Sequence, residues 1–231
     1  MTSSDDGYRA AVYTNALIMK EVVQYLDKQT LARLSQAGRQ GWQYALQPLW
    51  RILPFISVGQ IERFGTAAGN TIMIKTRGYA TYGDLVHTVG LSLLSGRWEK
   101  VKPEHLKIIV ENCKRLKDLD INLCLAIGPE WIAQIFQASP TTSASLTSLN
   151  LTEVAVNDIW LIDILKATPN LKSLEIGETD ITNRSLQYIG ESMKTLEYIE
   201  MRDCLEIDDN GVAALISGCT SLKYIGANNC P

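Results

Sequence analysis

The chain of 231 residues contains few of the residue types that build metal sites: 5 cysteines and 2 histidines. The cysteines form no Cys-x-x-Cys pair, so the usual zinc-ligand pattern is missing. Also missing are a Gly-x-Ser-x-Gly motif, a glycine-rich phosphate loop and a Cys–His pair at catalytic spacing. We therefore expect no catalytic residue, no metal and no cofactor, and a protein that is not an enzyme.

Long hydrophobic runs and a secretory signal pattern are absent as well. No apolar run approaches the roughly 20 residues that cross a bilayer, which predicts no membrane partner. Without a signal peptide, we expect a reducing cytoplasmic or nuclear compartment and free thiols. With 46% apolar and 20% charged residues, the chain can bury a sizeable core.

A net charge of −3 conceals an uneven distribution. Residues 1–115 carry 15 basic and 9 acidic side chains, whereas residues 116–231 carry 7 and 16. The acidic second half argues against nucleic acid as a partner and favours a partner with a basic segment.

One apolar pattern recurs through the acidic half. Leucine is followed three residues later by Leu or Ile and, two further on, by another apolar residue. The copies start at Leu116, Leu146, Leu171, Leu196 and Leu222, at steps of 30, 25, 25 and 26 residues. A weaker copy starts at Val86, 30 residues before Leu116. Such periods predict an α/β fold, a leucine-rich-repeat solenoid in which short parallel strands alternate with helices.

The copy at residues 196–218 shows how one unit is expected to fold. Ile199 and Met201 alternate as in a strand with one buried face, and Cys204 stands where a small group can bond the turning backbone. The residues from Asp208 supply helix N-cap chemistry, and Gly218 ends the helix. All five cysteines, Cys113, Cys124, Cys204, Cys219 and Cys230, are accordingly interpreted as buried structural thiols.

Three short amphipathic segments precede the repeats, at residues 16–27, 30–42 and 43–53, with Thr30 as the expected N-cap of the second. Modules this small bury little apolar surface alone, so they suit docking onto a partner. The alternative is a cap that shields the first repeat.

Within these segments, four motifs resemble the F-box: 22–27 (VVQYLD), 30–34 (TLARL), 38–42 (GRQGW) and 49–51 (LWR). An F-box followed by cysteine-containing leucine-rich repeats is the layout of F-box/LRR proteins, notably the fungal-type receptors. The resemblance covers most of residues 14–231. The resemblance implies a flexible N-terminal segment at residues 1–13, an F-box-like helical module at 14–54, a linker or helical cap at 55–85 and leucine-rich repeats at 86–231.

The resemblance implies the substrate-recognition subunit of a Skp–cullin–F-box (SCF) E3 ubiquitin ligase, acting in ubiquitin-dependent protein degradation. The module would bind a Skp-type adaptor and through it a cullin, while the repeats hold a target protein. The adaptor contacts implied by the family's apolar positions are Leu17, Ile18, Val22, Leu26, Leu31, Leu34, Trp42, Leu49 and Trp50. For Trp42 and Trp50, packing inside the module is an equal alternative.

Strand geometry predicts the target surface. Side chains between the buried leucines point outward, and stacked strands place them in columns about 4.8 Å apart. The selected residues are Asp118, Asp120, Asn150, Glu175, Tyr198, Glu200, Arg202 and Tyr224. We expect a basic peptide on this acidic face with the two tyrosines as anchors; a merely solvated face is the alternative.

A second class of function also fits: a leucine-rich-repeat scaffold or cell-cycle regulator outside SCF, whose N-terminal helices only cap the solenoid. The pair Thr14–Asn15, where an F-box usually has Leu-Pro, favours this alternative. The sequence ends at residues 228–231 without a further helix, so we expect an uncapped last repeat and a fragment of a longer protein.

Overall fold

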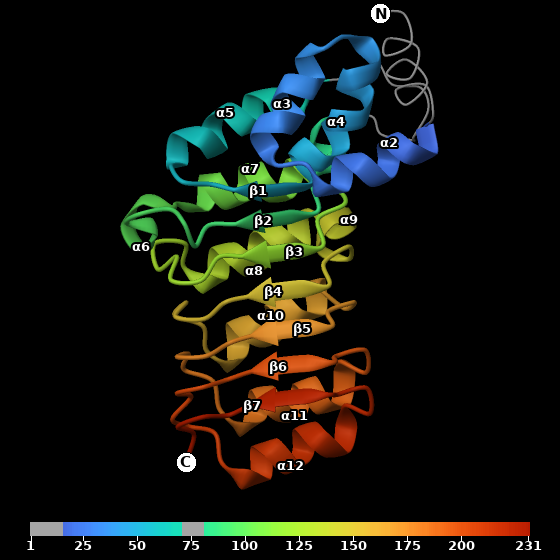
Figure 1. Ribbon diagram of the computed structural model, residues 1–231. Helices are drawn as coiled ribbons and strands as arrows, with labels where there is room; N and C mark the ends of the chain where they lie inside the picture. Colours follow the sequence, from blue (N-terminus) through green and yellow to red (C-terminus); the bar gives the residue numbers. More distant parts are fainter. Residues whose placement is uncertain (1–15, 71–80) are drawn as a thin grey trace, which may run out of the picture.

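A computed structural model describes residues 16–70 and 81–231, so the expected flexible segment 1–13 and the pair Thr14–Asn15 lie outside the described residues. Within them, seven parallel strands form one sheet whose order follows the chain (Figure 1). The strands are β1 (Ile52–Pro54), β2 (Thr88–Gly90), β3 (Asp118–Asp120), β4 (Ser148–Asn150), β5 (Ser173–Glu175), β6 (Tyr198–Glu200) and β7 (Tyr224–Gly226). The predicted α/β leucine-rich-repeat solenoid is confirmed.

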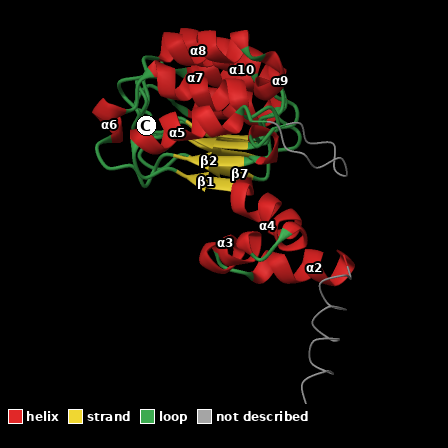
Figure 2. Cartoon of the chain, turned by 90° about the horizontal axis from the view of Figure 1, so that it is seen from above, coloured by secondary structure: helices red, strands yellow, loops and turns green. Residues whose placement is uncertain are grey.

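The middle residue of each strand points into the core. These residues pair in register along the sheet, and those of β2 to β6 are at most 1% exposed: Val89, Leu119, Leu149, Leu174 and Ile199. The helices that cover them are α7 (Pro103–Asn112), α8 (Pro129–Ala138), α10 (Asp158–Ala167), α11 (Asn183–Ser192) and α12 (Asp209–Gly218). Figure 2 shows α7, α8 and α10 together on one side of the sheet.

Backbone pairing between repeats continues past the three-residue strands. In the described part of the chain, the non-glycine residues with positive φ, between 55° and 59°, recur at one position of each turn: Leu123, Glu153, Glu178, Asp203 and Asn229. The first four donate their N–H to a carbonyl of the following repeat at 2.8 to 3.0 Å. This conformation is uncommon for residues with a side chain, and the recurring bond stabilises it.

Cysteine thiols support the same turns. Cys204 Sγ donates to the Ile176 carbonyl at 3.2 Å, as expected from its place in the repeat, and Cys230 Sγ donates to the Met201 carbonyl at 3.1 Å. The thiols of Cys113, Cys124, Cys204, Cys219 and Cys230 are free. Burial raises the pKa of Cys124 to about 12, so its thiol stays protonated and unreactive.

The helix start expected near Asp208 agrees with the structure. Asp208 caps α12 by accepting the Asn210 N–H at 2.8 Å, and α8 begins at Pro129. Two repeats are longer and carry extra short helices, α6 (Arg97–Lys100) and α9 (Pro140–Ser143). Figure 1 shows α6 and α9 near opposite ends of the strands. The additional residues therefore leave the strand ladder unbroken.

The sheet starts earlier than the sequence indicated. The sequence predicts residues 52–54 in the helical module and 55–85 as a linker or helical cap, but β1 pairs with β2, and a helix within 55–85, α5 (Val58–Ala68), packs beside α7. A degenerate repeat lies here, with Trp50 and Phe55 at the positions that leucine and isoleucine hold in β3's repeat. The aromatic residues concealed the pattern.

The N-terminal module consists of α2 (Ala16–Val22), a 3-10 turn at Val23–Tyr25, α3 (Lys28–Gln36) and α4 (Arg39–Arg51). The expected N-cap, Thr30, is wrong: α3 begins at Lys28, and the Asp27 carboxylate accepts the Thr30 N–H at 2.8 Å. The module has its own small core, formed by Met19, Val23, Leu31, Leu34 and Ala45.

Across residues 16–70 and 81–231, no helix is both long and apolar enough to cross a bilayer.

Replacing Leu174 with alanine should lower the free energy of unfolding by about 2–5 kcal/mol, because a buried strand-centre side chain is lost and a cavity remains. Urea denaturation followed by circular dichroism measures the change. Ser173→Ala alters the adjacent residue on the open face and is expected to change stability by about 0.5 kcal/mol or less. Similar effects from both variants would contradict the described register.

The Asp158 carboxylate joins α10 to α11. It accepts the N–H and hydroxyl of Thr182 at 2.9 and 2.8 Å and the Ser185 hydroxyl at 2.5 Å. Burial alone would raise the pKa of Asp158, but the bonds from Ser185 and Thr182 outweigh it and lower the pKa.

Because the folded-state pKa is depressed, the stability contributed by Asp158 is present above the unfolded-state value of about 3.9 and is lost as the pH falls through the folded-state pKa. Asp158→Ala should therefore lower the urea midpoint at pH 7, and the difference from wild type should shrink below about pH 4. Asp163→Ala, on the same helix with a surface lysine partner, serves as the control. A difference independent of pH would reject this account.

Candidate functional site

The face of the sheet opposite helices α7 to α12 carries the residues predicted to bind a target. Strand register aligns them in two columns. One column contains Asp118, Ser148, Ser173, Tyr198 and Tyr224, and the other contains Asp120, Asn150, Glu175, Glu200 and Gly226. Both columns flank the buried strand centres, so their side chains point away from the core. We call this surface the open face.

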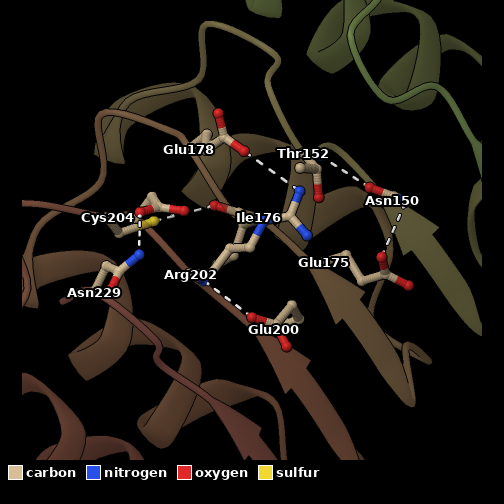
Figure 3. A network of polar contacts seen from close by, with 10 residues as sticks. Asn150, Thr152, Glu175, Ile176, Glu178, Glu200, Arg202, Cys204 and Asn229 are labelled. Carbon is tan, nitrogen blue, oxygen red and sulfur yellow. Dashed lines mark hydrogen bonds and ion pairs between the residues drawn. The ribbon is translucent and has the colours of Figure 1, made fainter.

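Carboxylates dominate the second column. Glu175 is half-buried and accepts a hydrogen bond from Asn150 Nδ2 at 3.0 Å (Figure 3). Burial raises the pKa of Glu175, and the charges of Asp120 and Glu200 raise it further, against the opposing effect of Arg202. The three acidic residues therefore repel one another, and an added cation would relieve that repulsion.

Short local bonds hold these side chains in place. Asp120 Oδ1 accepts the N–H of Asn122 at 3.1 Å, and Glu200 Oε1 accepts the N–H of Arg202 at 3.1 Å. Asn150 Oδ1 makes the equivalent bond at 2.9 Å. Each bond reaches two residues along the chain, so the polar groups are fixed at the strand ends before any partner arrives.

The predicted tyrosine anchors lie together. The rings of Tyr198 and Tyr224 stack with centroids 4.5 Å apart and planes 6° apart. The Tyr224 hydroxyl donates to Glu200 Oε2 at 3.2 Å, which joins the aromatic pair to the acidic column. Burial raises the pKa of Tyr198, as do the neighbouring Tyr224, Glu175 and Glu200, so its hydroxyl stays protonated.

Arg202, also predicted to contact a target, has a partner within the chain. Its Nη2 lies 3.3 Å from Glu178 Oε1, and Figure 3 shows the side chain extending from the end of β6 toward Glu178. The sequence prediction missed Glu178, which occupies the positive-φ position of its turn. Glu178 occupies the same repeat position as Asp203, the residue after Arg202. Extending the predicted surface by this one turn position would have identified it.

The opposite edge of the open face has a different charge pattern that the sequence prediction also missed. Before β5, β6 and β7 come Lys172, Glu197 and Lys223, and both lysines reach Glu197, at 3.1 and 2.5 Å. These two ion pairs lower the pKa of Glu197, with the Lys223 bond the larger cause. Glu197 therefore pairs with two lysines at the strand beginnings, a third, Lys117, donates to the Ser145 carbonyl at 3.0 Å, and the strand ends stay acidic.

The nine residues implied to contact an adaptor are distributed over three environments. Ile18 and Val22 are 44% and 40% exposed, and the neighbouring Tyr25, which was not selected, is 85% exposed. Leu31 and Leu34 lie inside the module's core, and Leu26 and Leu49 pack against that core. Leu17 lies in α2, and its side chain is outside the described residues.

The two tryptophans face the solenoid. Trp42 and Trp50 pack around Leu46 and Leu85, as the intramodule alternative expected in part. Trp50 also contacts Tyr82, outside the module, with ring centroids 4.8 Å apart and planes tilted by 36°. It therefore ties α4 to the first repeats rather than presenting a ring to solvent.

A cleft of about 980 Å³ lies between the module and the first strands and includes Lys28, Arg51 and Thr88 in its lining. Lys28 Nζ donates to the Ile52 carbonyl at 2.7 Å, and burial lowers the pKa of Lys28. Thr88 donates to Asp118 Oδ2 at 2.9 Å, so the cleft borders the open face.

Comparisons with known proteins agree with this architecture. No protein-family model matches the chain. Over 132 residues, or 54% of this chain, it is 29% identical to the F-box/LRR-repeat protein 4 of Bos taurus, and it spans 20% of that protein's length. Part of the chain is thus similar in sequence to an F-box/LRR protein.

Among solved structures, the TLR13–ssRNA13 complex matches 90% of this chain and 24% of that chain, with a TM-score of 0.50 and 16% identity. This likeness concerns the fold alone. The yeast Rad7–Elc1 complex covers 96% of this chain and 76% of that chain at a TM-score of 0.33 and 14% identity, a superposition too loose to support an argument.

Glu175→Gln should raise the urea midpoint at pH 7. A raised folded-state pKa means that the stability linked to this group is fully present below the unfolded-state pKa and is lost as pH rises through the folded-state value. Glutamine keeps an acceptor for Asn150 but carries no charge. The gain should disappear below about pH 4, where glutamate is protonated in both states. Ser173→Gln, a neutral change on the same strand, is the control, and destabilisation by Glu175→Gln at pH 7 would contradict the repulsion.

Proposed function

We propose that this chain is the target-recognition part of an SCF-type E3 ubiquitin ligase. The helical module binds a Skp-type adaptor and through it a cullin, and the open face binds a target protein for ubiquitin-dependent degradation. The partial similarity to an F-box/LRR-repeat protein supports this reading, together with the order of a helical module before a repeat solenoid.

The observation that carries the proposal is the exposed apolar surface of the module. Ile18, Val22 and Tyr25 follow one another at intervals of three or four residues, and all three side chains are 40% exposed or more. The module's own core is already formed by other residues, so these side chains are not needed to fold it. Apolar side chains in such a row suit a helix-and-groove contact with another protein.

Such a receptor needs no chemistry of its own. It raises the effective concentration of a target lysine near a ubiquitin-charged enzyme, and the acceleration comes from proximity. For that purpose the module and the repeats must keep a fixed geometry. The direct passage from α4 into β1 and the packing of Trp50 on Tyr82 supply it. The proposed protein is therefore not an enzyme, and it acts in the cytoplasm or nucleus.

A second function has its own support: a repeat scaffold or cell-cycle regulator whose N-terminal helices only cap the solenoid. Trp50 occupies a repeat position and α4 leads into the first strand, as expected of a cap. Against this reading, β1 and α5 already cover β2 and α7, so α2 and α3 are not required for capping.

The deciding experiment is calorimetric titration of the purified chain with a Skp-type adaptor. Wild type should bind, and Val22→Asp should weaken binding by about 30-fold or more, because a charge would enter an apolar contact. Ile159→Asp is the matched control, since Ile159 is 57% exposed on α10, away from the module. It should bind as wild type does.

Absence of binding by a folded wild-type chain would support the scaffold reading. Equal weakening by both aspartate variants would mean that the contact is not made by the module.

A further inference from the structure

The strand ends of the open face carry more acidic than basic side chains. Asp120, Glu175 and Glu200 lie in one column on β3, β5 and β6, and Asp118 lies on β3 in the neighbouring column. At the strand beginnings, Lys172 and Lys223 pair with Glu197 and Lys117 donates to the Ser145 carbonyl, whereas at the strand ends Arg202 pairs with Glu178. A partner that covers this face must therefore bring positive charge.

An aromatic pair borders the acidic column. Tyr224 is 44% exposed, stacks on Tyr198 and bonds to Glu200. In the column of the two tyrosines, the two preceding strands carry Ser148 and Ser173, whose side chains are much shorter than that of tyrosine. A long side chain lying over the serines would meet Glu175, which is two residues from Ser173 on β5, and the ring of Tyr198, which is in register with Ser173.

From this arrangement, and resting on the proposed role of the repeats as the target-binding part, we infer that the open face of β3 to β7 binds an extended, arginine-bearing segment of the target protein. An arginine side chain fits because its planar guanidinium both pairs with carboxylates and stacks on aromatic rings. The chain's own Arg202 already places a guanidinium against a carboxylate at the border of this face.

The electrostatics of the face make the binding favourable at neutral pH. The sheet holds Asp120, Glu175 and Glu200 in one column, with Asn150 between the first two, and the charges of Asp120 and Glu200 raise the pKa of Glu175 beyond the effect of burial. An arriving guanidinium removes part of that repulsion. A phosphorylated or acidic segment would increase it, and the face therefore selects against such segments.

The test uses a fluorescein-labelled ten-residue peptide of glycine, serine and three arginines, titrated with the full chain at about 150 mM salt, where long-range attraction is screened. A copy with citrulline in place of arginine keeps the shape and loses the charge. Anisotropy should report binding of the arginine peptide, and the citrulline copy should bind at least about tenfold more weakly.

Two double variants locate the binding. Glu175→Gln with Glu200→Gln should weaken binding of the arginine peptide about tenfold or more. Glu111→Gln with Glu191→Gln changes the net charge equally on helices α7 and α11, and it should leave binding unchanged. Equal losses in both double variants, no binding by wild type, or equal binding of the citrulline copy would each overturn the inference.

The adaptor titration on the same preparation separates this inference from the proposed function. If the chain binds the adaptor but not the arginine peptide, the class of target is wrong and the receptor role stands. If the peptide binds at the open face and the adaptor does not, the face stands and the receptor role fails.

Discussion

Burial of the strand-centre side chains is the constraint on which the solenoid depends. A strand of three residues cannot exclude water from its own leucine, so each repeat needs the next one against it. The parallel register follows from this need, because only aligned strands place Leu119, Leu149 and Leu174 in one continuous core. Thiols, positive-φ turns and helix caps then bond the polar backbone left at each turn.

The same alignment has a consequence on the other side of the sheet. Residues that flank the leucines are stacked as closely as the leucines themselves, whatever their charge. Glu175 is therefore held in one column with Asp120 and Glu200, although burial and the charges of these two residues raise its pKa and disfavour its ionised form. A sheet that gains stability from one face can thus retain unfavourable charge on the other, which is common at binding surfaces.

Much of this arrangement could be predicted, because the spacing of leucines specifies both the strands and their register. The two columns of the open face followed directly. The prediction failed where aromatic residues replaced leucine, at Trp50 and Phe55, so β1 was assigned to the helical module. It also could not separate Ile18 from Leu31, since a helical stripe contains both core and surface residues. The pairing of Arg202 with Glu178 depends on side-chain conformation, which periodicity does not encode.

The constant spacing of the strands fixes the distance between the helical module and any residue of the open face. Five steps of about 4.8 Å separate β1, which follows the helical module, from β6, where Tyr198 lies, a span of about 24 Å. Trp50 packs the end of α4 against Tyr82 and so fixes the position of the helical module relative to the first strand. Deleting or inserting one repeat would move a bound segment by one strand spacing, about 4.8 Å, relative to the module. The side chains that hold the segment would stay the same.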